Sequence, residues 1–240
     1  MSSPLLKIGT CGFSLARSGY YRLFSAVEVQ QTFYQPPSLK TALRWREEAP
    51  SGFEFSMKAW QLITHEPSSP TYRRLRQPVP SAKYALYGSF RPTEEVLEAW
   101  RVTEEIARAL QVRVILFQSP ASFQPTEANE AHLRSFFRKI KRRDYLLVWE
   151  PRGDWPEQAI EDLCRELDLI HGVDPYQNRQ LCGLIRYFRL HGKGGHPYRY
   201  TERDLLWLKE QIDPEVITYL MFNNISMAED AERLKRLIDG

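Results

Sequence analysis

Cysteine is scarce in this chain, and its arrangement excludes two classes of small stapled domain. Cys11, Cys164 and Cys182 are the only cysteines among 240 residues, and none lies in a Cys-x-x-Cys pattern. A disulfide framework needs paired cysteines, and a structural zinc site needs clustered ones. We therefore expect neither, and the sequence favours a reducing, cytoplasmic location.

Long apolar runs and a strong charge of one sign are also missing. No stretch approaches the roughly 18 apolar residues of a membrane span, and Met1–Lys7 lacks the apolar region of a secretory signal. The chain has 33 Lys and Arg residues against 30 Asp and Glu residues, a net charge of +3. We expect no membrane partner, and so small an excess of positive charge does not favour nucleic acid.

What the chain does contain is a set of short apolar runs, several of which end in ionisable residues. Runs rich in Val, Ile, Phe and Tyr are typical of strands. The runs predicted as strands are Leu5–Gly12, Ala26–Phe33, Phe53–Trp60, Val112–Gln118, Tyr145–Glu150, Leu169–Val173, Ile185–His191 and Val216–Phe222. Charges are costly inside a sheet unless they are paired or hydrated, so their position at strand ends is typical of an α/β barrel active site.

Helical patterns separate most of these strands. The predicted helices are Ser38–Glu48, Thr93–Gln111, Thr126–Lys141, Pro156–Leu167, Thr201–Gln211 and Ser226–Ile238. Alternating strands and helices indicate a parallel sheet, and no G-x-G-x-x-G motif favours an open nucleotide-binding sheet. We predict a TIM-like (β/α)8 barrel forming a single domain over residues 1–240, with an elaborated loop between strands 3 and 4. That loop, 61–92, contains Pro67, Pro70, Pro78, Pro80 and Pro92, which exclude a long helix.

Five of these segments, in this order, resemble the motifs of the DUF72 (YecE-like) family. They are Val27–Tyr34, Phe53–Lys58 with Ile63–His65, Trp149–Arg152, Tyr187–Gly192 and Phe222–Asn224. The resemblance implies an α/β barrel over nearly the whole chain and no particular reaction, because the family is of unknown function. The chain departs from the family pattern at Thr10–Phe13, where Thr-Ser-Gly-Trp is usual, and at Gln30, where Asn is usual.

Three residues at strand ends are the candidate catalytic groups: Lys58, Glu150 and His191. A buried Lys58 could serve as a general base, a Schiff-base nucleophile or an anion anchor. Glu150 lies between Trp149 and Pro151, so burial is expected to raise its pKa into the range of a general acid or base. The alternative for both residues is a structural ion pair.

Other polar residues near the predicted barrel mouth are candidates for binding the substrate. They are Glu28, His65, Arg152, Asp174, Arg189, Asn223 and Asn224. The basic groups and amides can satisfy a carboxylate or phosphate, although the acids can neutralise the basic groups instead. The two asparagines have a structural alternative, an Asx-turn into the last helix. Cys11 has no expected base and is not favoured as a nucleophile.

The leading hypothesis is an enzyme that acts on a small polar or anionic substrate by acid/base chemistry at the C-terminal barrel mouth. Hydrolase, lyase and isomerase chemistry are not distinguished, and the cofactor and oligomeric state are unknown. A divalent metal is not favoured, because Lys58 and Arg152 would compete with it. One alternative is a nucleic-acid-directed phosphoesterase or binding protein that uses the basic runs 72–76 and 134–143 with Tyr84, Tyr87 and Phe90. Another is a non-catalytic barrel that binds a metabolite or a partner.

Overall fold

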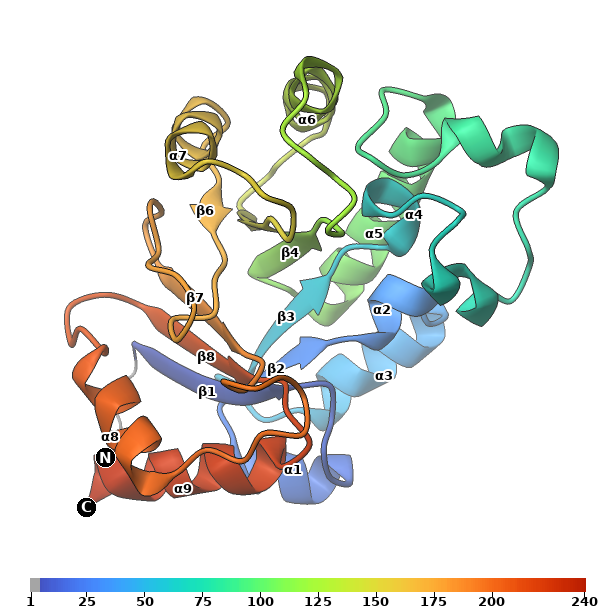
Figure 1. The fold of residues 1–240 in the computed structure, drawn as a ribbon. Helices are drawn as coiled ribbons and strands as arrows, with labels where there is room; N and C mark the ends of the chain where they lie inside the picture. Colours follow the sequence, from blue (N-terminus) through green and yellow to red (C-terminus); the bar gives the residue numbers. More distant parts are fainter. Residues whose placement is uncertain (1–4) are drawn as a thin grey trace.

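Eight parallel strands form the barrel that the sequence predicts (Figure 1). The computed structural model describes residues 5–240, so the first four residues of Met1–Lys7 lie outside it. The strands are β1 (Leu6–Cys11), β2 (Ala26–Val29), β3 (Glu54–Lys58), β4 (Val114–Gln118), β5 (Leu146–Glu150), β6 (Ile170–His171), β7 (Arg186–Leu190) and β8 (Thr218–Phe222). Their order is β6-β5-β4-β3-β2-β1-β8-β7, and a single parallel bridge from Val173 to Phe188 joins the two edges.

Helices surround the strands and cover the outer face of the barrel (Figure 1). They are α1 (Arg17–Leu23), α2 (Gln31–Tyr34), α3 (Leu39–Glu48), α4 (Gln61–Thr64), α5 (Glu94–Leu110), α6 (Glu127–Lys139), α7 (Glu157–Glu166), α8 (Glu202–Glu210) and α9 (Met227–Asp239). Within residues 5–240, no helix combines the length and the apolar character needed to cross a bilayer.

The cap residues explain where the predicted helices begin. Ser38, Thr93, Thr126 and Thr201 each accept a backbone N–H from the first turn of the following helix. The helix predicted over Ser226–Ile238 begins without a side-chain cap, because the Ser226 hydroxyl makes no such hydrogen bond. The chain before α9 is held instead by the preceding Asn224, whose carbonyl accepts the Met227 N–H.

Three connections differ from the sequence-based expectation. The strand predicted over Ala26–Phe33 ends at Val29, and α2 follows, because Thr32 turns inward and donates to the carbonyls of Val29 and Lys58. Helix α1 was not predicted, since Ala16 at its N-terminus provides no side-chain cap. No helix connects β6 to β7 in the described chain, and an irregular loop over 172–185 takes its place.

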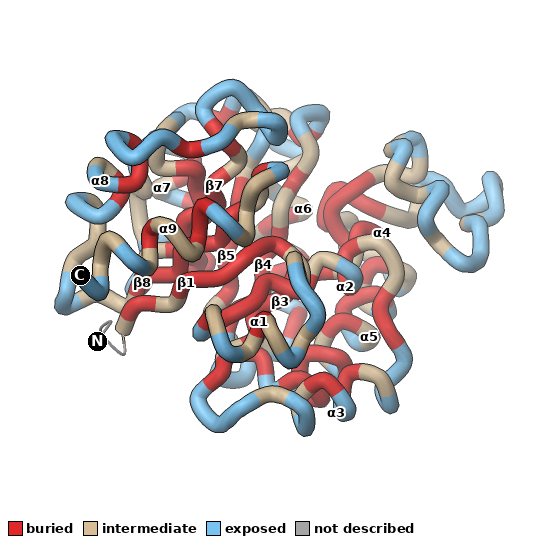
Figure 2. Tube along the Cα trace, turned by 90° about the horizontal axis from the view of Figure 1, so that it is seen from below, coloured by how far each residue is buried: buried red, intermediate tan, exposed pale blue. Residues whose placement is uncertain are grey.

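The side chains of each strand contribute to two apolar layers, because successive residues point to opposite faces of the sheet. Outward residues pack against the helices in one large core. Inward residues fill the barrel and include Leu116, Val148, Tyr187 and Met221. Figure 2 shows buried residues concentrated along the strands and on the helix faces that contact them. The polar ends of the strands therefore lie above this inward apolar layer, at the mouth of the barrel.

The long β3–α5 connection, predicted as an elaborated loop, extends away from the barrel (Figures 1 and 2). It contains α4 and two short 3-10 helices, η1 (Pro70–Arg74) and η2 (Ser81–Leu86), whose residues are partly or fully exposed. Phe90 does not belong to an exposed aromatic platform, as the nucleic-acid alternative assumed. It is fully buried and packs against Phe117, Phe123 and Phe136.

The basic run 134–143 is largely paired with acidic residues. Arg134 and Arg138 both bind the carboxylate of Glu166, and Arg143 binds Glu104. These ion pairs reduce the positive charge that the surface presents to a polyanion.

Candidate functional site

The centre of the barrel mouth is a buried ion-pair network between β2 and β7. The guanidinium of Arg189 contacts Glu28 through Nε (2.9 Å to Oε2) and Nη2 (2.8 Å to Oε1). Tyr187 donates to the same carboxylate at 2.8 Å, and Gln30 also donates to it. The Glu28 and Arg189 side chains are 0% and 1% exposed. Because they are buried and paired with each other, Glu28 and Arg189 support the site from below and are not accessible to a ligand.

Glu150, at the end of β5, connects this network to the mouth. Its Oε2 accepts from Arg189 (2.7 Å) and from Gln118 (2.9 Å), whereas its Oε1 faces Arg152 (2.9 Å). Burial alone would raise the pKa of Glu150, but Arg189 and Arg152 outweigh it and hold the pKa well below its usual range. The expectation of a raised pKa is therefore wrong, and Glu150 is a permanent anion.

Lys58, at the end of β3, has a different environment. Its Nζ donates to Oε1 of Gln118 at 2.7 Å and lies 3.7 Å from the ring centroid of Phe33. No carboxylate of residues 5–240 forms an ion pair with it. Burial, and then the positive charge of Arg189, lower the pKa of Lys58 to about 7. Lys58 is 6% exposed and forms no structural ion pair, contrary to that alternative.

His191 and Arg152 form the more accessible rim of the same site. The imidazole Nε2 lies 3.3 Å from Oε1 of Glu150, and Nδ1 lies 3.0 Å from the amide nitrogen of Asn223. Arg152 reaches both Glu150 and His191. Burial lowers the pKa of His191 below its ordinary value, so the ring is neutral at pH 7. Both ring nitrogens therefore have protein partners, which fix the orientation of the imidazole.

Two candidate binding residues lie beside this centre. Asp174 accepts the backbone N–H groups of His191 (2.9 Å) and Tyr176 (3.1 Å), and burial raises its pKa. His65 packs edge-on against Phe33 and pairs with Thr64; burial, followed by the charge of Lys58, lowers its pKa to about 3. Asp174 thus positions the His191 backbone, and His65 helps to enclose Lys58.

The structure does not bring Asn224 to the mouth. Its side chain is fully buried, and its amide nitrogen donates to the carbonyl of Tyr198 and to Asp230 of α9, both at 2.7 Å. Asn224 therefore anchors the last helix, but not by the Asx-turn that the sequence left open, because its Oδ1 accepts no hydrogen bond from residues 5–240. Cys11 is enclosed as well, 3.6 Å from Nη2 of Arg189, and burial raises its pKa well above the usual value.

Two residues that the sequence reasoning missed complete the site. Gln118 ends β4 opposite Glu150 in the strand register, and its single carboxamide joins Lys58 to Glu150. Gln118 was not expected at the site, because only ionisable residues at strand ends were candidates and an amide carries no charge. His171 is 4% exposed at the end of β6, and burial lowers its pKa to about 4.

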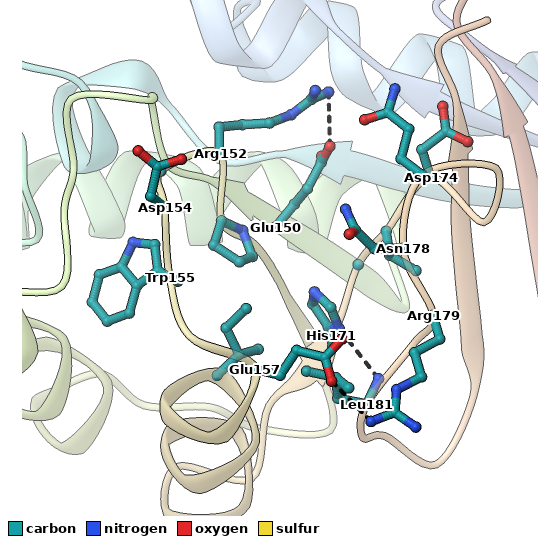
Figure 3. A pocket seen from close by; sticks show the side chains of 16 residues that line it. Glu150, Arg152, Asp154, Trp155, Glu157, His171, Asp174, Asn178, Arg179 and Leu181 are labelled. Atoms are coloured by element: carbon teal, nitrogen blue, oxygen red, sulfur yellow. Dashed lines mark hydrogen bonds and ion pairs between the residues drawn. The ribbon is translucent and has the colours of Figure 1, made fainter. Parts of the chain in front are cut away.

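A cavity of about 300 Å³ opens beside the mouth (Figure 3), and we name it the side cavity. It lies between the β5–α7 loop and the β6–β7 loop, where the barrel has no helix. Its lining includes Glu150, Arg152, Asp154, Trp155, Glu157, Ile160, His171, Asp174, Gln177, Asn178, Arg179 and Leu181. Nδ1 of His171 accepts the Leu181 N–H at 3.2 Å, which fixes the proton on Nε2, and Nε2 has no hydrogen-bond partner among residues 5–240.

Within residues 5–240, no three His, Cys, Asp or Glu side chains come together in a way that could hold a metal ion. The acids of the mouth are instead engaged by Arg189, Arg152 and Gln118.

Comparison with known proteins places this architecture in a family. No curated protein matches the chain. A DUF72 protein of Thermotoga maritima is similar at 21% identity and a TM-score of 0.70, covering 98% of this chain and 99% of that one. A DUF72 protein of Enterococcus faecalis has 19% identity and a TM-score of 0.72, with 98% of both chains covered. A xylose isomerase domain containing protein of Salmonella typhimurium shares the fold at 13% identity and a TM-score of 0.63, with both chains fully covered. The family described as "Protein of unknown function DUF72" matches residues 15–239, and the chain therefore belongs to the DUF72 family.

Proposed function

We propose that this protein is an enzyme that acts on a small polar molecule by acid/base chemistry at the C-terminal mouth of the barrel. The observation that carries the proposal is Lys58, a buried amine with a pKa of about 7 and no carboxylate partner. A lysine that only stabilises a fold is normally charged and paired or hydrated. Keeping this amine partly neutral at physiological pH prepares it to take a proton from a bound substrate.

Gln118 fixes the orientation of the Lys58 amine. Its carbonyl oxygen accepts from the amine while its NH2 group donates to Glu150, so the amide cannot rotate without losing both hydrogen bonds. The anionic Glu150 then acts through charge: it favours the protonated amine that proton abstraction would create. We assign proton transfer to Lys58, electrostatic positioning to Glu150, and hydrogen bonding or proton relay to the neutral His191.

The side cavity is where the rest of the substrate would lie. Its charged pairs are satisfied internally, Arg152 by Glu150 and Arg179 by Glu157 at 2.8 Å. The groups left for a ligand are the carboxylate of Asp154, the Nε2–H of His171 and the amides of Gln177 and Asn178. At roughly 30 Å³ per water, the cavity has the volume of about ten waters. These features favour a small hydroxyl- or carbonyl-bearing molecule over a strongly anionic one.

Turnover of a metabolite mixture tests the proposal. Purified protein is incubated with a small-molecule extract, and mass spectrometry records which compounds are consumed and which appear. The Lys58→Met variant removes the amine, and Lys40→Met, on the exposed face of α3, is a matched control. We expect wild type and Lys40→Met to convert the same compound and Lys58→Met to leave it unchanged.

The other outcomes distinguish the alternatives. A compound that binds and is released unchanged by all three proteins would support a non-catalytic metabolite-binding barrel. Binding of nucleic acid that weakens steeply with salt would support the nucleic-acid alternative. Equal turnover by wild type and Lys58→Met would refute the role assigned to Lys58.

A further inference from the structure

Two of the three cysteines meet on the outer side of the barrel, although nothing in their spacing indicates it. Cys164 lies on α7, and Cys182 lies in the β6–β7 loop. Both side chains line the same cavity, and the interaction between the two thiols is the largest influence on the pKa of each. Cys164 is 1% exposed, whereas Cys182 is half-buried, and both are free. The two thiols are therefore neighbours, as a disulfide between them would require.

The path of the loop holds Cys182 against β6, the strand that follows α7. The backbone of His171 donates to the carbonyl of Cys182 at 3.1 Å, and the N–H of Leu181 is held by the ring of His171. Gly183 then adopts a φ of 128°, and a Cβ at this position would lie 2.8 Å from the Ile170 side chain. Only glycine allows the chain after Cys182 to pass so close to β6.

The two thiols differ in reactivity. The hydrogen bond from Cys164 lowers the pKa of Cys182, whereas the same hydrogen bond, together with burial, raises the pKa of Cys164. A second cavity of about 300 Å³ is lined by both cysteines and by the exposed Leu184. Cys182 is thus the more accessible of the two thiols, and Cys164 is its buried neighbour.

We propose that Cys164 and Cys182 form a reversible disulfide by exchange with a low-molecular-weight disulfide. The thiolate of Cys182 attacks one sulfur of the oxidant, which forms a mixed disulfide and releases one small thiolate. The sulfur of Cys164 then attacks the sulfur of Cys182, which forms the protein disulfide and releases the second small thiolate. The two protein thiols lose two electrons, the oxidant gains them, and the two released thiolates take up the two protons.

The disulfide connects the two walls of the side cavity. Helix α7 contributes Glu157 and Ile160 to one wall, and the loop that ends at Cys182 contributes Asp174 and Leu181 to the other. Oxidation therefore restrains the loop that takes the place of a helix between β6 and β7. A new crosslink in the native geometry reduces the freedom of the unfolded chain, so we expect it to stabilise the fold.

The test uses the whole protein, reduced and then equilibrated in glutathione buffers of increasing oxidising strength. Free thiols are trapped with an alkylating reagent, and peptide mapping identifies each cysteine. In wild type we expect Cys164 and Cys182 to become resistant to alkylation at the same point of the series, while the mass of the protein falls by two hydrogens. We expect the melting temperature to rise by several degrees. Buried Cys11 serves as an internal control and stays reduced.

Matched variants isolate each step. Cys164→Ser, or Cys164→Ala if the serine variant does not fold, is expected to stop at a glutathione adduct on Cys182. Cys182→Ser is expected to form neither species. The proposal is overturned if both cysteines of the wild type stay alkylatable in the most oxidising buffer. It is equally overturned if the wild type accumulates the mixed disulfide without resolving it.

Discussion

The environment of Lys58 makes folding stability depend on pH in a way that one substitution should abolish. The pKa of a lysine in an unfolded chain is about 10.4, and in the folded protein burial and the charge of Arg189 lower it to about 7. Between these values the unfolded chain binds more protons at this position than the folded protein does. The free energy of unfolding must therefore rise with pH across this range.

The size of the effect follows from the two pKa values. From pH 7 to pH 9, a folded-state pKa of about 7 gives an increase of about 2 kcal/mol in unfolding free energy from Lys58 alone. Lys58→Met removes the titration and leaves an unbranched side chain of similar length beside Phe33. We expect the stability of the variant to equal or exceed that of wild type at pH 7, and to show an increase from pH 7 to pH 9 that is smaller by about 2 kcal/mol.

Urea denaturation at pH 7, 8 and 9 measures the difference, with Lys40→Met as the control that should follow wild type. Titrations of other groups are shared by the three proteins and cancel in the comparison. Identical pH dependence in wild type and Lys58→Met would show that Lys58 has an ordinary pKa. That result would remove the main support for its role in proton transfer.

Other perturbations test the rest of the site. Arg189→Met leaves Glu28 buried without its cation and should reduce the unfolding free energy by roughly 3–5 kcal/mol in urea denaturation, whereas adding Glu28→Gln should recover part of the loss. Glu150→Gln removes a charge that raises the pKa of Lys58, so the midpoint of pH-dependent acylation of Lys58, followed by mass spectrometry, should move further below 7; an upward shift would contradict the assigned electrostatics. Burial lowers the pKa of His171 from its ordinary value near 6.5 to about 4, so the unfolded chain binds more protons between these values and stability falls with acidification. Between pH 7 and pH 5 wild type should lose about 2 kcal/mol more than His171→Gln in the same denaturation assay, and equal losses would count against the neutral, buried ring.

The sequence alone was sufficient for the barrel and for the location of its polar end. Parallel strands of similar length place their C-terminal residues at one end, so Lys58, Glu150 and His191 were expected to converge there, and they do. Helix starts were equally local, since Ser38 and Thr93 satisfy backbone groups only a few residues away. Gln118 also ends a strand, but its amide carries no charge, so it was not among the ionisable residues expected at the mouth.

The tertiary structure decided the electrostatics and the pairings between distant segments. The pKa of Glu150 depends on Arg189, which approaches it from two strands away around the barrel, and burial alone pointed in the opposite direction. The low pKa of Lys58 likewise depends on its burial and on the nearby charge of Arg189. The residues next to Lys58 in the sequence indicate neither of these. The contact between Cys164 and Cys182 depends on the path of an irregular loop. Periodicity and capping are properties of neighbouring residues, whereas pKa values and long-range contacts depend on distances that only the folded chain establishes.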